Sequence, residues 1–267
     1  MTKLSGRTVV LTGASSGIGA EAARKLARLG ATVCLLARRE EQLEGVRAGI
    51  EAAGGIAHAY VVDLADPAAA DAVVARLLGE HPRIDVLVNN AARSIRRPIT
   101  ESLDRAHDYE RTMAINYFGA VRLTLGLLPR FLEQGHGHVV ISSSMSTQVP
   151  IPLFSAYLAS KAALESFARS LTAELGDQRI TSTVVHFPMV RTEMSSATAI
   201  YQAMPMLSAD KAATWLVKAV VDRPTRVTSL PGAVGELGMA ALPGVVTRVT
   251  QPFFRHMDRT LARRTRP

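Results

Sequence analysis

Short apolar runs alternate with longer amphipathic stretches along most of this chain, and this alternation limits the possible fold more than any other feature. Runs of this length suit strands that are buried on both faces, while the stretches between them are long enough for helices. No repeat, low-complexity block or linker breaks the pattern. The predicted strands span 7–12, 32–36, 56–62, 84–88, 138–142 and 180–185, and the main predicted helices span 17–29, 40–53, 105–133 and 155–176.

The alternation predicts an α/β protein with one doubly wound parallel sheet and helices on both of its faces. A chain of 267 residues suits one large domain with a continuous core, so we expect residues 1–267 to form a single domain. Hydrophobic residues make up 48% of the chain but aromatic residues only 5%, which fits helices packed closely on such a sheet. In this architecture, ligands bind at the carboxyl ends of the strands.

A glycine-rich turn joins the first predicted strand to the first predicted helix. Gly13, Gly17 and Gly19 permit a tight turn and a close approach of the backbone to a pyrophosphate. The following helix offers unpaired N–H groups and a positive dipole end to the phosphates. A purely structural turn is the alternative, but the strand–turn–helix context favours a dinucleotide site. The expected contacts in this turn are Gly13, Ser15, Ser16, Gly17, Ile18 and Gly19.

The end of the second predicted strand distinguishes between the two nicotinamide dinucleotides. An NAD enzyme usually has an acidic residue there to bind the ribose 2′-hydroxyl, whereas this chain has Ala37 followed by Arg38 and Arg39. Guanidinium groups suit a 2′-phosphate, so the sequence predicts NADP(H). The alternative is that both arginines only begin a solvated helix. The ends of the third and fourth strands supply further expected cofactor contacts, namely Asp63, Leu64, Asn90 and Ala91.

Tyr157 and Lys161 lie four residues apart in a predicted helix, so their side chains share one face. That face continues as an apolar stripe, which places the pair at the buried end of the helix near the crevice. Hydride reduction of a carbonyl leaves an alkoxide that needs a proton, and a phenol with a pKa of about 10 is a sluggish participant near neutral pH. Because a neighbouring ammonium stabilises the phenolate, the pair fits carbonyl–alcohol chemistry.

Two more residues complete the predicted catalytic set of Asn116, Ser144, Tyr157 and Lys161. Ser144 follows the fifth strand, and its hydroxyl can hold the substrate carbonyl; an ordinary turn or cap residue is the alternative. Asn116 falls on an apolar helix stripe, where a buried amide needs hydrogen-bond partners. A structural network or a water-bridged contact to Lys161 would supply them. Tyr157 and Lys161 are also expected to contact the cofactor.

These motifs resemble, in order and spacing, those of the short-chain dehydrogenase/reductase family over about residues 5–195. The resemblance implies a Rossmann-type fold, hydride transfer, and a homodimer or homotetramer built from the two long helices. It also implies cofactor contacts from Pro188, Val190 and Thr192. Residues 191–267 are then expected to form a substrate loop and a C-terminal helical extension.

Two positions depart from the family pattern, because Ala92 and Met189 stand where glycine is usual. Met189 adds bulk beside the expected nicotinamide position. We therefore expect altered loop geometry at these two places but the same cofactor.

A narrower resemblance is to bacterial fatty acyl-CoA reductases of the same family, which make aldehydes from acyl thioesters. It rests on the segments 93–97, 107–113, 116–122 and 223–226. Arg93, Arg96 and Arg97 would then meet the phosphates of coenzyme A; ion pairs from these arginines to Glu101 and Asp104 are the alternative. The expected substrate is an apolar carbonyl compound or an acyl thioester. An oxidoreductase for ketones, alcohols, steroids or retinoids is a second possibility, and a non-catalytic cofactor sensor is a third that the retained catalytic residues disfavour.

The formal charge of +8 is dispersed along the chain, apart from a denser arginine-rich end at 255–266. Nucleic-acid binders usually interleave aromatic residues with such basic residues, and this chain does not, so no nucleic-acid partner is expected. Cys34 is the only cysteine, and neither a signal peptide nor a membrane-spanning run is visible, so we expect a cytoplasmic protein. The histidines lack metal-ligand spacing, and no metal is expected.

Residues 230–254 are apolar but broken by glycine and proline. Shielding of an acyl chain, peripheral membrane contact, an oligomer interface and a core-covering helix all fit that segment.

Overall fold

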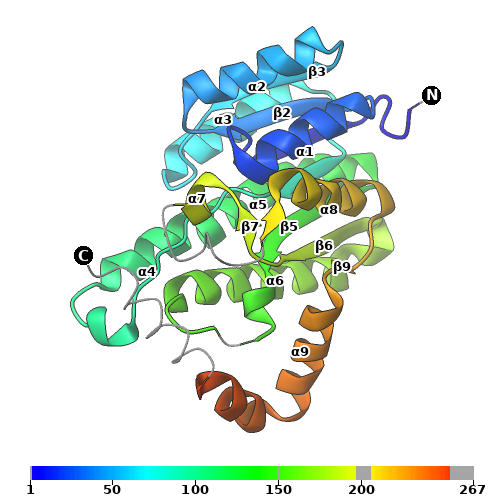
Figure 1. The fold of residues 1–267 in the computed structure, drawn as a ribbon. Coiled ribbons are helices and arrows are strands. Elements are labelled where there is room, and N and C mark those ends of the chain that lie inside the picture. The colour runs from blue at the N-terminus through cyan, green and yellow to red at the C-terminus, as the bar shows by residue number, and fades with distance from the viewer. Residues whose placement is uncertain (1, 150, 197–205, 253–267) are drawn as a thin grey trace.

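The computed structural model describes residues 2–149, 151–196 and 206–252, and within them seven parallel strands form one sheet that crosses the molecule (Figure 1). The strands are β1 (Thr8–Thr12), β2 (Thr32–Ala37), β3 (Ile56–Val61), β4 (Val86–Asn89), β5 (Gly137–Ser144), β6 (Ile180–Phe187) and β9 (Arg226–Val227). Their order across the sheet is β3-β2-β1-β4-β5-β6-β9. The chain therefore extends the sheet in one direction from β1 and in the other from β4, which creates a crevice between these two strands at their carboxyl ends.

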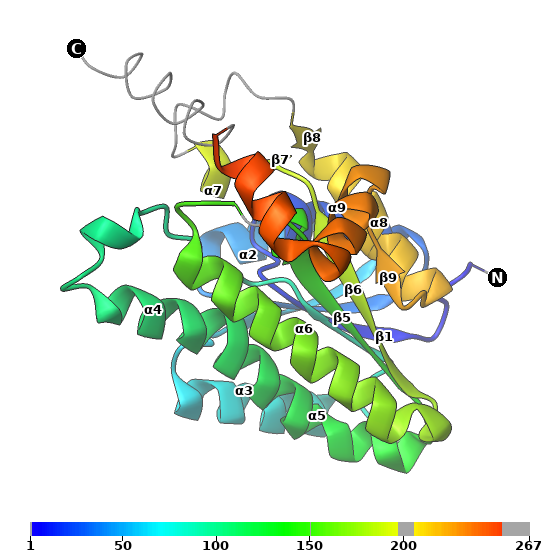
Figure 2. The same cartoon turned by 90° about the horizontal axis from the view of Figure 1, so that it is seen from below.

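Helices cover both faces of this sheet (Figures 1 and 2). They are α1 (Gly17–Arg28), α2 (Glu40–Ala52), α3 (Pro67–Glu80), α4 (Ala106–Met113), α5 (Ala120–Gln134), α6 (Ser155–Leu175), α7 (Glu193–Ser196), α8 (Ala209–Asp222) and α9 (Leu230–Ala241). One apolar cluster joins α1, α2 and α8 to the sheet, and a second joins α3, α5 and α6 to the opposite face. Val9 and Leu11 belong to the first cluster while Val10 belongs to the second, because successive side chains of a strand point to opposite faces.

The predicted α/β fold with a parallel sheet and helices on both faces is confirmed, and the six predicted strands begin within two residues of the observed ones. The short edge strand β9 was not predicted, and neither was the small sheet of β7 (Val190–Arg191) and β8 (Leu207–Ser208). Strands of two residues carry too little hydrophobic pattern to be recognised. The predicted helix 105–133 is instead α4, a π-helical segment (Ala114–Gly119) and α5 in succession.

The apolar segment that resisted assignment is helical as far as the structure describes it. It contains α9 and a further helix over 243–252, and the arginine-rich end at 255–266 lies outside the described residues. Gly232 of α9 is so close to Met145 that an added Cβ would lie 2.9 Å from that side chain. Gln148 Nε2 also donates a hydrogen bond to Glu236 at 2.7 Å. This helix is therefore attached to the segment that follows β5.

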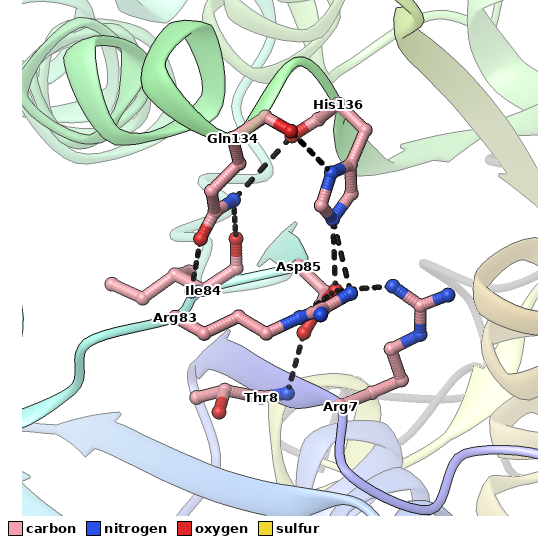
Figure 3. Close-up of polar contacts among 7 residues, drawn as sticks. All are labelled: Arg7, Thr8, Arg83, Ile84, Asp85, Gln134 and His136. Atoms are coloured by element: carbon pink, nitrogen blue, oxygen red, sulfur yellow. Dashed lines mark hydrogen bonds and ion pairs between the residues drawn. The ribbon is translucent and has the colours of Figure 1, made fainter.

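At the opposite end of the sheet, a buried carboxylate holds together the starts of the central strands (Figure 3). Asp85 is 0% exposed and precedes β4. Its oxygens accept hydrogen bonds from Arg83 Nε at 2.8 Å, from the Thr8 amide at 3.0 Å, from His136 Nε2 at 3.1 Å, and from Arg7. Burial alone would raise the pKa of Asp85, but these hydrogen bonds outweigh it and lower the pKa to about 2.

Replacing Asp85 with Asn should destabilise the fold by roughly 2–4 kcal/mol at neutral pH, because the buried ends of its cationic partners lose their carboxylate. Since the folded pKa lies below the usual 3.8, the stabilisation is complete above that value and is lost as the pH falls through about 2. The difference in free energy of unfolding between wild type and variant, measured with urea, should therefore shrink in acid.

The matched control is Asp71→Asn, which removes an exposed partner of Arg122 and should cost under about 1 kcal/mol. Equal costs for the two variants, or a cost for Asp85→Asn that does not change with pH, would contradict the assigned role.

Candidate active site

The carboxyl ends of β1, β4 and β5 are joined by polar side chains. Thr12 Oγ1 accepts hydrogen bonds from the backbone N–H groups of Asn90 and Ala91, both at 2.9 Å. The Asn90 amide donates to Thr12 O at 3.0 Å and accepts from Ser142 Oγ at 3.1 Å. Asn90 and Ala91, which are expected to contact the cofactor, lie against the glycine turn, and the Asn90 side chain holds the shape of that turn.

The glycine turn leaves no room for side chains at two of its positions. A Cβ on Gly13, whose φ is +67°, would lie 2.9 Å from Ala91 Cα, and one on Gly19 would lie 2.1 Å from Gly13 O. Gly17 begins α1, and the Ser16 side chain makes no capping hydrogen bond to this helix. The N-terminus of α1 thus has backbone N–H groups without a side-chain cap, next to glycines that have no side chains. This combination suits a pyrophosphate.

Arg38 and Arg39 lie at the carboxyl end of β2 beside this turn. Arg39 donates to Ser16 Oγ at 2.6 Å and to Glu193 Oε2 at 2.7 Å. Arg38 lies 3.6 Å from a carboxylate oxygen of Asp63. Arg39 also stands at the N-cap of α2, so the two interpretations of these arginines do not exclude each other. Both arginines thus lie where the sequence predicts the contacts to a 2′-phosphate, Arg38 beside Asp63 and Arg39 beside Ser16.

Ser144, Tyr157 and Lys161 come together at the carboxyl end of β5. Ser144 is the last residue of that strand, Tyr157 is in the first turn of α6, and a hydrogen bond links their side chains. Lys161, 1% exposed, lies one turn further along α6. Its Nζ donates to Ser142 O at 2.7 Å and lies 5.9 Å from the centroid of the Tyr157 ring. The pair is at the buried end of the helix, where the sequence placed it.

The electrostatics of this group differ from the sequence-based expectation. Burial, with a smaller contribution from the negative charge of Glu165, raises the pKa of Tyr157 to about 12, although its hydrogen bond with Ser144 acts in the opposite direction. Burial lowers the pKa of Lys161 to about 8. In the protein alone, desolvation therefore outweighs the stabilisation of a phenolate by Lys161. The positive charge of an oxidised nicotinamide would supply the missing stabilisation.

Asn116 is fully buried in the π-helical segment, and its side-chain amide bonds to two neighbouring segments. Its Oδ1 accepts from the Arg93 amide at 2.7 Å, while Nδ2 donates to Arg93 O and to Ser160 Oγ, both at 2.9 Å. Asn116 thus connects the segment after β4 to α6, which is the structural network that the sequence left open. Oδ1 can accept a second hydrogen bond, so the expected water-bridged contact to Lys161 stays a prediction.

The other predicted cofactor contacts lie at the same edge of the sheet. Asp63 Oδ1 accepts from the Ala65 amide at 3.0 Å, and Leu64 is buried. A Cβ on Gly17 would lie 3.1 Å from Thr192 Cγ2, which places Thr192 against the glycine turn. The segment containing Pro188 and Val190 follows β6 directly.

The backbone at Met189, where glycine is usual in the family, is held by a hydrogen bond from the Leu207 amide at 2.9 Å.

Arg93 and Arg97, two of the three arginines that follow β4, have different contacts. Arg93 uses its backbone to hold Asn116. Arg97 Nε lies 3.4 Å from Asp108 Oδ2, so its partner is Asp108 rather than Glu101 or Asp104. Asp108 is buried on α4, and this ion pair fixes the segment after β4 to that helix.

Three residues that the sequence analysis did not single out hold the site together: Thr12, Ser160 and Glu165. Thr12 fixes the glycine turn, and Ser160 bonds to Asn116. Glu165 is a buried acid one turn beyond Lys161, in the middle of the apolar stripe of α6. The sequence signal that could have revealed Glu165 is an acidic residue within the apolar stripe of this helix.

No cluster of three or more His, Cys, Asp or Glu side chains able to hold a metal ion occurs among residues 2–149, 151–196 and 206–252. Over the same residues, no helix combines the length and the hydropathy that crossing a membrane requires.

Comparison with known proteins agrees with this geometry. The short chain dehydrogenase family model matches residues 7–202. A fatty acyl-CoA reductase of Acinetobacter baylyi is 44% identical over 240 residues, covering 90% of this chain and 81% of the relative. A fatty acyl-CoA reductase of Mycobacterium tuberculosis is also 44% identical, over 84% of this chain and 76% of its own length.

Solved structures show the same fold. A metagenomic short-chain oxidoreductase in complex with NADP is 31% identical with a TM-score of 0.72, covering 85% of this chain and 100% of its own. A short chain dehydrogenase/reductase from Burkholderia phymatum in complex with NAD is 23% identical with a TM-score of 0.79, covering 88% and 92%.

The parallel sheet, the glycine turn and the Ser144–Tyr157–Lys161 group together define an oxidoreductase that uses a nicotinamide cofactor. The chain belongs to the short-chain dehydrogenase/reductase family.

Replacing Gly19 with Ala should weaken binding of the nicotinamide cofactor at least tenfold, or about 1.4 kcal/mol, because the new Cβ displaces the turn from its place against Gly13 O. Gly49→Ala on α2 is the control, since a Cβ there meets nothing within 4 Å. Cofactor affinity, measured by fluorescence titration, should stay unchanged in the control. Unimpaired binding by Gly19→Ala would refute the role of this turn.

Proposed function

We propose that this protein is an NADPH-dependent reductase that converts a fatty acyl-CoA into an aldehyde. The observation that carries the proposal is the 44% identity to a fatty acyl-CoA reductase over 90% of this chain. The geometry adds a hydroxyl, a partly buried phenol and a buried ammonium within one group. Reduction of a thioester carbonyl needs such a group to hold the oxygen and to supply a proton.

The bound nicotinamide would supply a hydride to the thioester carbon, so that acyl-CoA, NADPH and a proton give the aldehyde, free coenzyme A and NADP⁺. Ser144 holds the carbonyl oxygen by a hydrogen bond, and Tyr157 donates the proton. The carbon–sulfur bond then breaks, which re-forms the carbonyl as the aldehyde and releases coenzyme A as the thiol that carries this proton away. Lys161 stabilises the phenolate that Tyr157 becomes and donates to the nicotinamide ribose. Asn116 is assigned a supporting role, because its bonds to Arg93 and Ser160 hold α6 against the segment after β4.

NADP(H) is favoured over NAD(H) by the charges at the end of β2. Arg38 and Arg39 present two guanidinium groups beside the glycine turn, and Ala37 stands where an acid would select the unphosphorylated ribose. The proposed cofactor site consists of the glycine turn with Gly13, Ser15, Ser16, Gly17, Ile18 and Gly19, and of Arg38, Arg39, Asp63, Leu64, Asn90, Ala91, Tyr157, Lys161, Pro188, Val190 and Thr192.

Coenzyme A would bind beside the segment after β4, with Arg93, Arg96 and Arg97 as the partners of its phosphates. Arg97 would keep its ion pair with Asp108, a carboxylate that it shares with Arg105. The acyl chain would lie along α9, which is attached to the residues directly after Ser144. A ketone or alcohol oxidoreductase is the alternative, and it would use the same Ser144–Tyr157–Lys161 group.

Two exposed apolar surfaces are part of the proposal. Phe118 and Leu125 lie exposed on the helix that runs from the π-helical segment into α5, which supports a homodimer or homotetramer built from the long helices. Leu230, Leu237 and Val249 are exposed on α9 and the helix 243–252, at 79%, 71% and 70%. These side chains support peripheral contact of that segment with a membrane surface.

Replacing both Arg38 and Arg39 with Ala should raise the Kd for NADPH roughly 100-fold or more, because each lost charge-assisted hydrogen bond is worth about 1.5–3 kcal/mol and every 1.4 kcal/mol is tenfold. The Kd for NADH should change little. Fluorescence titrations with both cofactors measure the ratio. Equal weakening for NADPH and NADH would show that the arginines only shape the turn and would remove the basis for NADP(H) preference.

The proposed reaction is tested by NADPH oxidation with purified protein across acyl-CoAs, aldehydes and ketones, with the aldehyde product identified. Turnover should be highest with long-chain acyl-CoA, and Tyr157→Phe should lose roughly 10²-fold or more of it because the proton donor is gone. NADPH should still bind to this variant. Retained turnover in Tyr157→Phe would refute the proton-donor assignment, and activity confined to ketones or alcohols would replace the proposed substrate class.

A further inference from the structure

A buried carboxylate lies one helical turn beyond Lys161, and the proposed reaction gives it no part. Glu165 on α6 is 9% exposed. One of its oxygens, Oε1, faces Ser143 Oγ, Thr147 Oγ1 at 2.7 Å and His186 Nε2 at 3.3 Å, each as a hydrogen-bond donor. Burying a charged carboxylate is costly unless donors compensate it, and here three donors do so.

The donors to Glu165 come from the segments that form the site. Ser143 is in β5 next to Ser144, and Thr147 is in the 3-10 turn that follows (Met145–Thr147). His186 is near the end of β6, just before the predicted nicotinamide contacts. Thr147 Oγ1 also lies 2.8 Å from Ser144 O. Glu165 therefore connects the segment around Ser144 and the end of β6 to the helix of Tyr157 and Lys161.

Lys161 needs a compensating charge that its direct contact does not provide. It is 1% exposed, and its Nζ donates to the neutral carbonyl of Ser142. The negative charge of Glu165 favours the protonated form of Lys161 and opposes ionisation of Tyr157. Both effects serve carbonyl reduction, because Tyr157 must hold a proton to give and Lys161 must carry a charge.

We propose that Glu165 is a positioning residue that keeps Lys161 protonated and Tyr157 in its phenol form. It also holds the segment around Ser144 against α6. The inference rests on the proposed function, since it takes Tyr157 to be the proton donor. His186 acts one step further away by donating to Glu165 and keeping that carboxylate ionised.

The titratable groups that face Glu165 come from two elements. Tyr157 and Lys161 are on its own helix, and His186 is on β6, while β5 and the following turn contribute the hydroxyl groups of Ser143 and Thr147. Burial by itself raises the pKa of Glu165, but donation from His186 and from the hydroxyls outweighs this and lowers it. Glu165 thus stays charged over the range in which Lys161 titrates.

Replacing Glu165 with Gln should lower the titration midpoint of Lys161, about 8 with Glu165 in place, by about one pH unit or more. Lysine side-chain NMR on protein without substrate measures this directly, since the chain has five lysines and Lys161→Met assigns the signal. The result does not depend on which substrate the enzyme reduces, so it separates failure of this inference from failure of the proposed function.

Three further variants interpret that titration. Glu165→Asp keeps the charge and should restore most of the midpoint, whereas Glu174→Gln removes an exposed carboxylate of the same helix and should leave it unchanged. Glu165→Met removes the charge with a side chain that suits the apolar stripe of α6. It should lower the midpoint as Glu165→Gln does, which keeps the inference testable if Glu165→Gln folds poorly.

The pH profile of kcat for reduction provides the second measurement. In Glu165→Gln the alkaline limb should move to lower pH by about the same amount as the Lys161 midpoint, because Lys161 loses its proton earlier. A purely structural role would lower kcat at every pH and leave both the limb and the NMR midpoint in place. That result would overturn the inference.

Discussion

The hydrogen bonds among Thr12, Asn90 and Ser142 hold together the carboxyl ends of β1, β4 and β5, and the rest of the site depends on them. These strands are buried on both faces, so polar side chains find partners mainly where the strands end. Asn90 and Ala91 lie against the glycine turn closely enough to exclude a Cβ at Gly13. The glycine turn and the Ser144–Tyr157–Lys161 group are therefore held at one edge of the sheet by the same hydrogen bonds. At the other end of the same strands, the buried carboxylate of Asp85 performs the corresponding task by accepting hydrogen bonds from Arg83 and from the Thr8 amide.

The chemistry of the site follows from burying charge at that edge. Desolvation raises the pKa of Tyr157 and lowers the pKa of Lys161, so burial favours the neutral form of both groups. Glu165 shifts the balance toward a charged Lys161, and an oxidised nicotinamide would then favour the phenolate. The direction of proton transfer is thus coupled to the charge that arrives with the cofactor. Such a group can hold its proton until hydride transfer has occurred.

Sequence reasoning located the strands, the glycine turn and the residues Ser144, Tyr157 and Lys161, because each follows from a periodicity or a spacing that local physics imposes. It did not find β9, whose two residues carry no periodic signal. It left a structural network open for Asn116 but could not name Arg93 and Ser160 as its partners, because a π-helical segment changes which residues face each other. Glu165 was missed because its donors come from β5, the turn after it and β6. Only the folded chain brings those segments together.

The central claim is that this edge of the sheet directs hydride from NADPH to the carbonyl carbon of an acyl thioester. The most direct measurement uses NADPH carrying deuterium at both C4 positions, with a long-chain acyl-CoA as substrate and mass spectrometry of the products. The account predicts an aldehyde with one deuterium on its carbonyl carbon and one equivalent of free coenzyme A. Intact acyl-CoA without deuterium, alongside a ketone that is reduced and labelled under the same conditions, would contradict it.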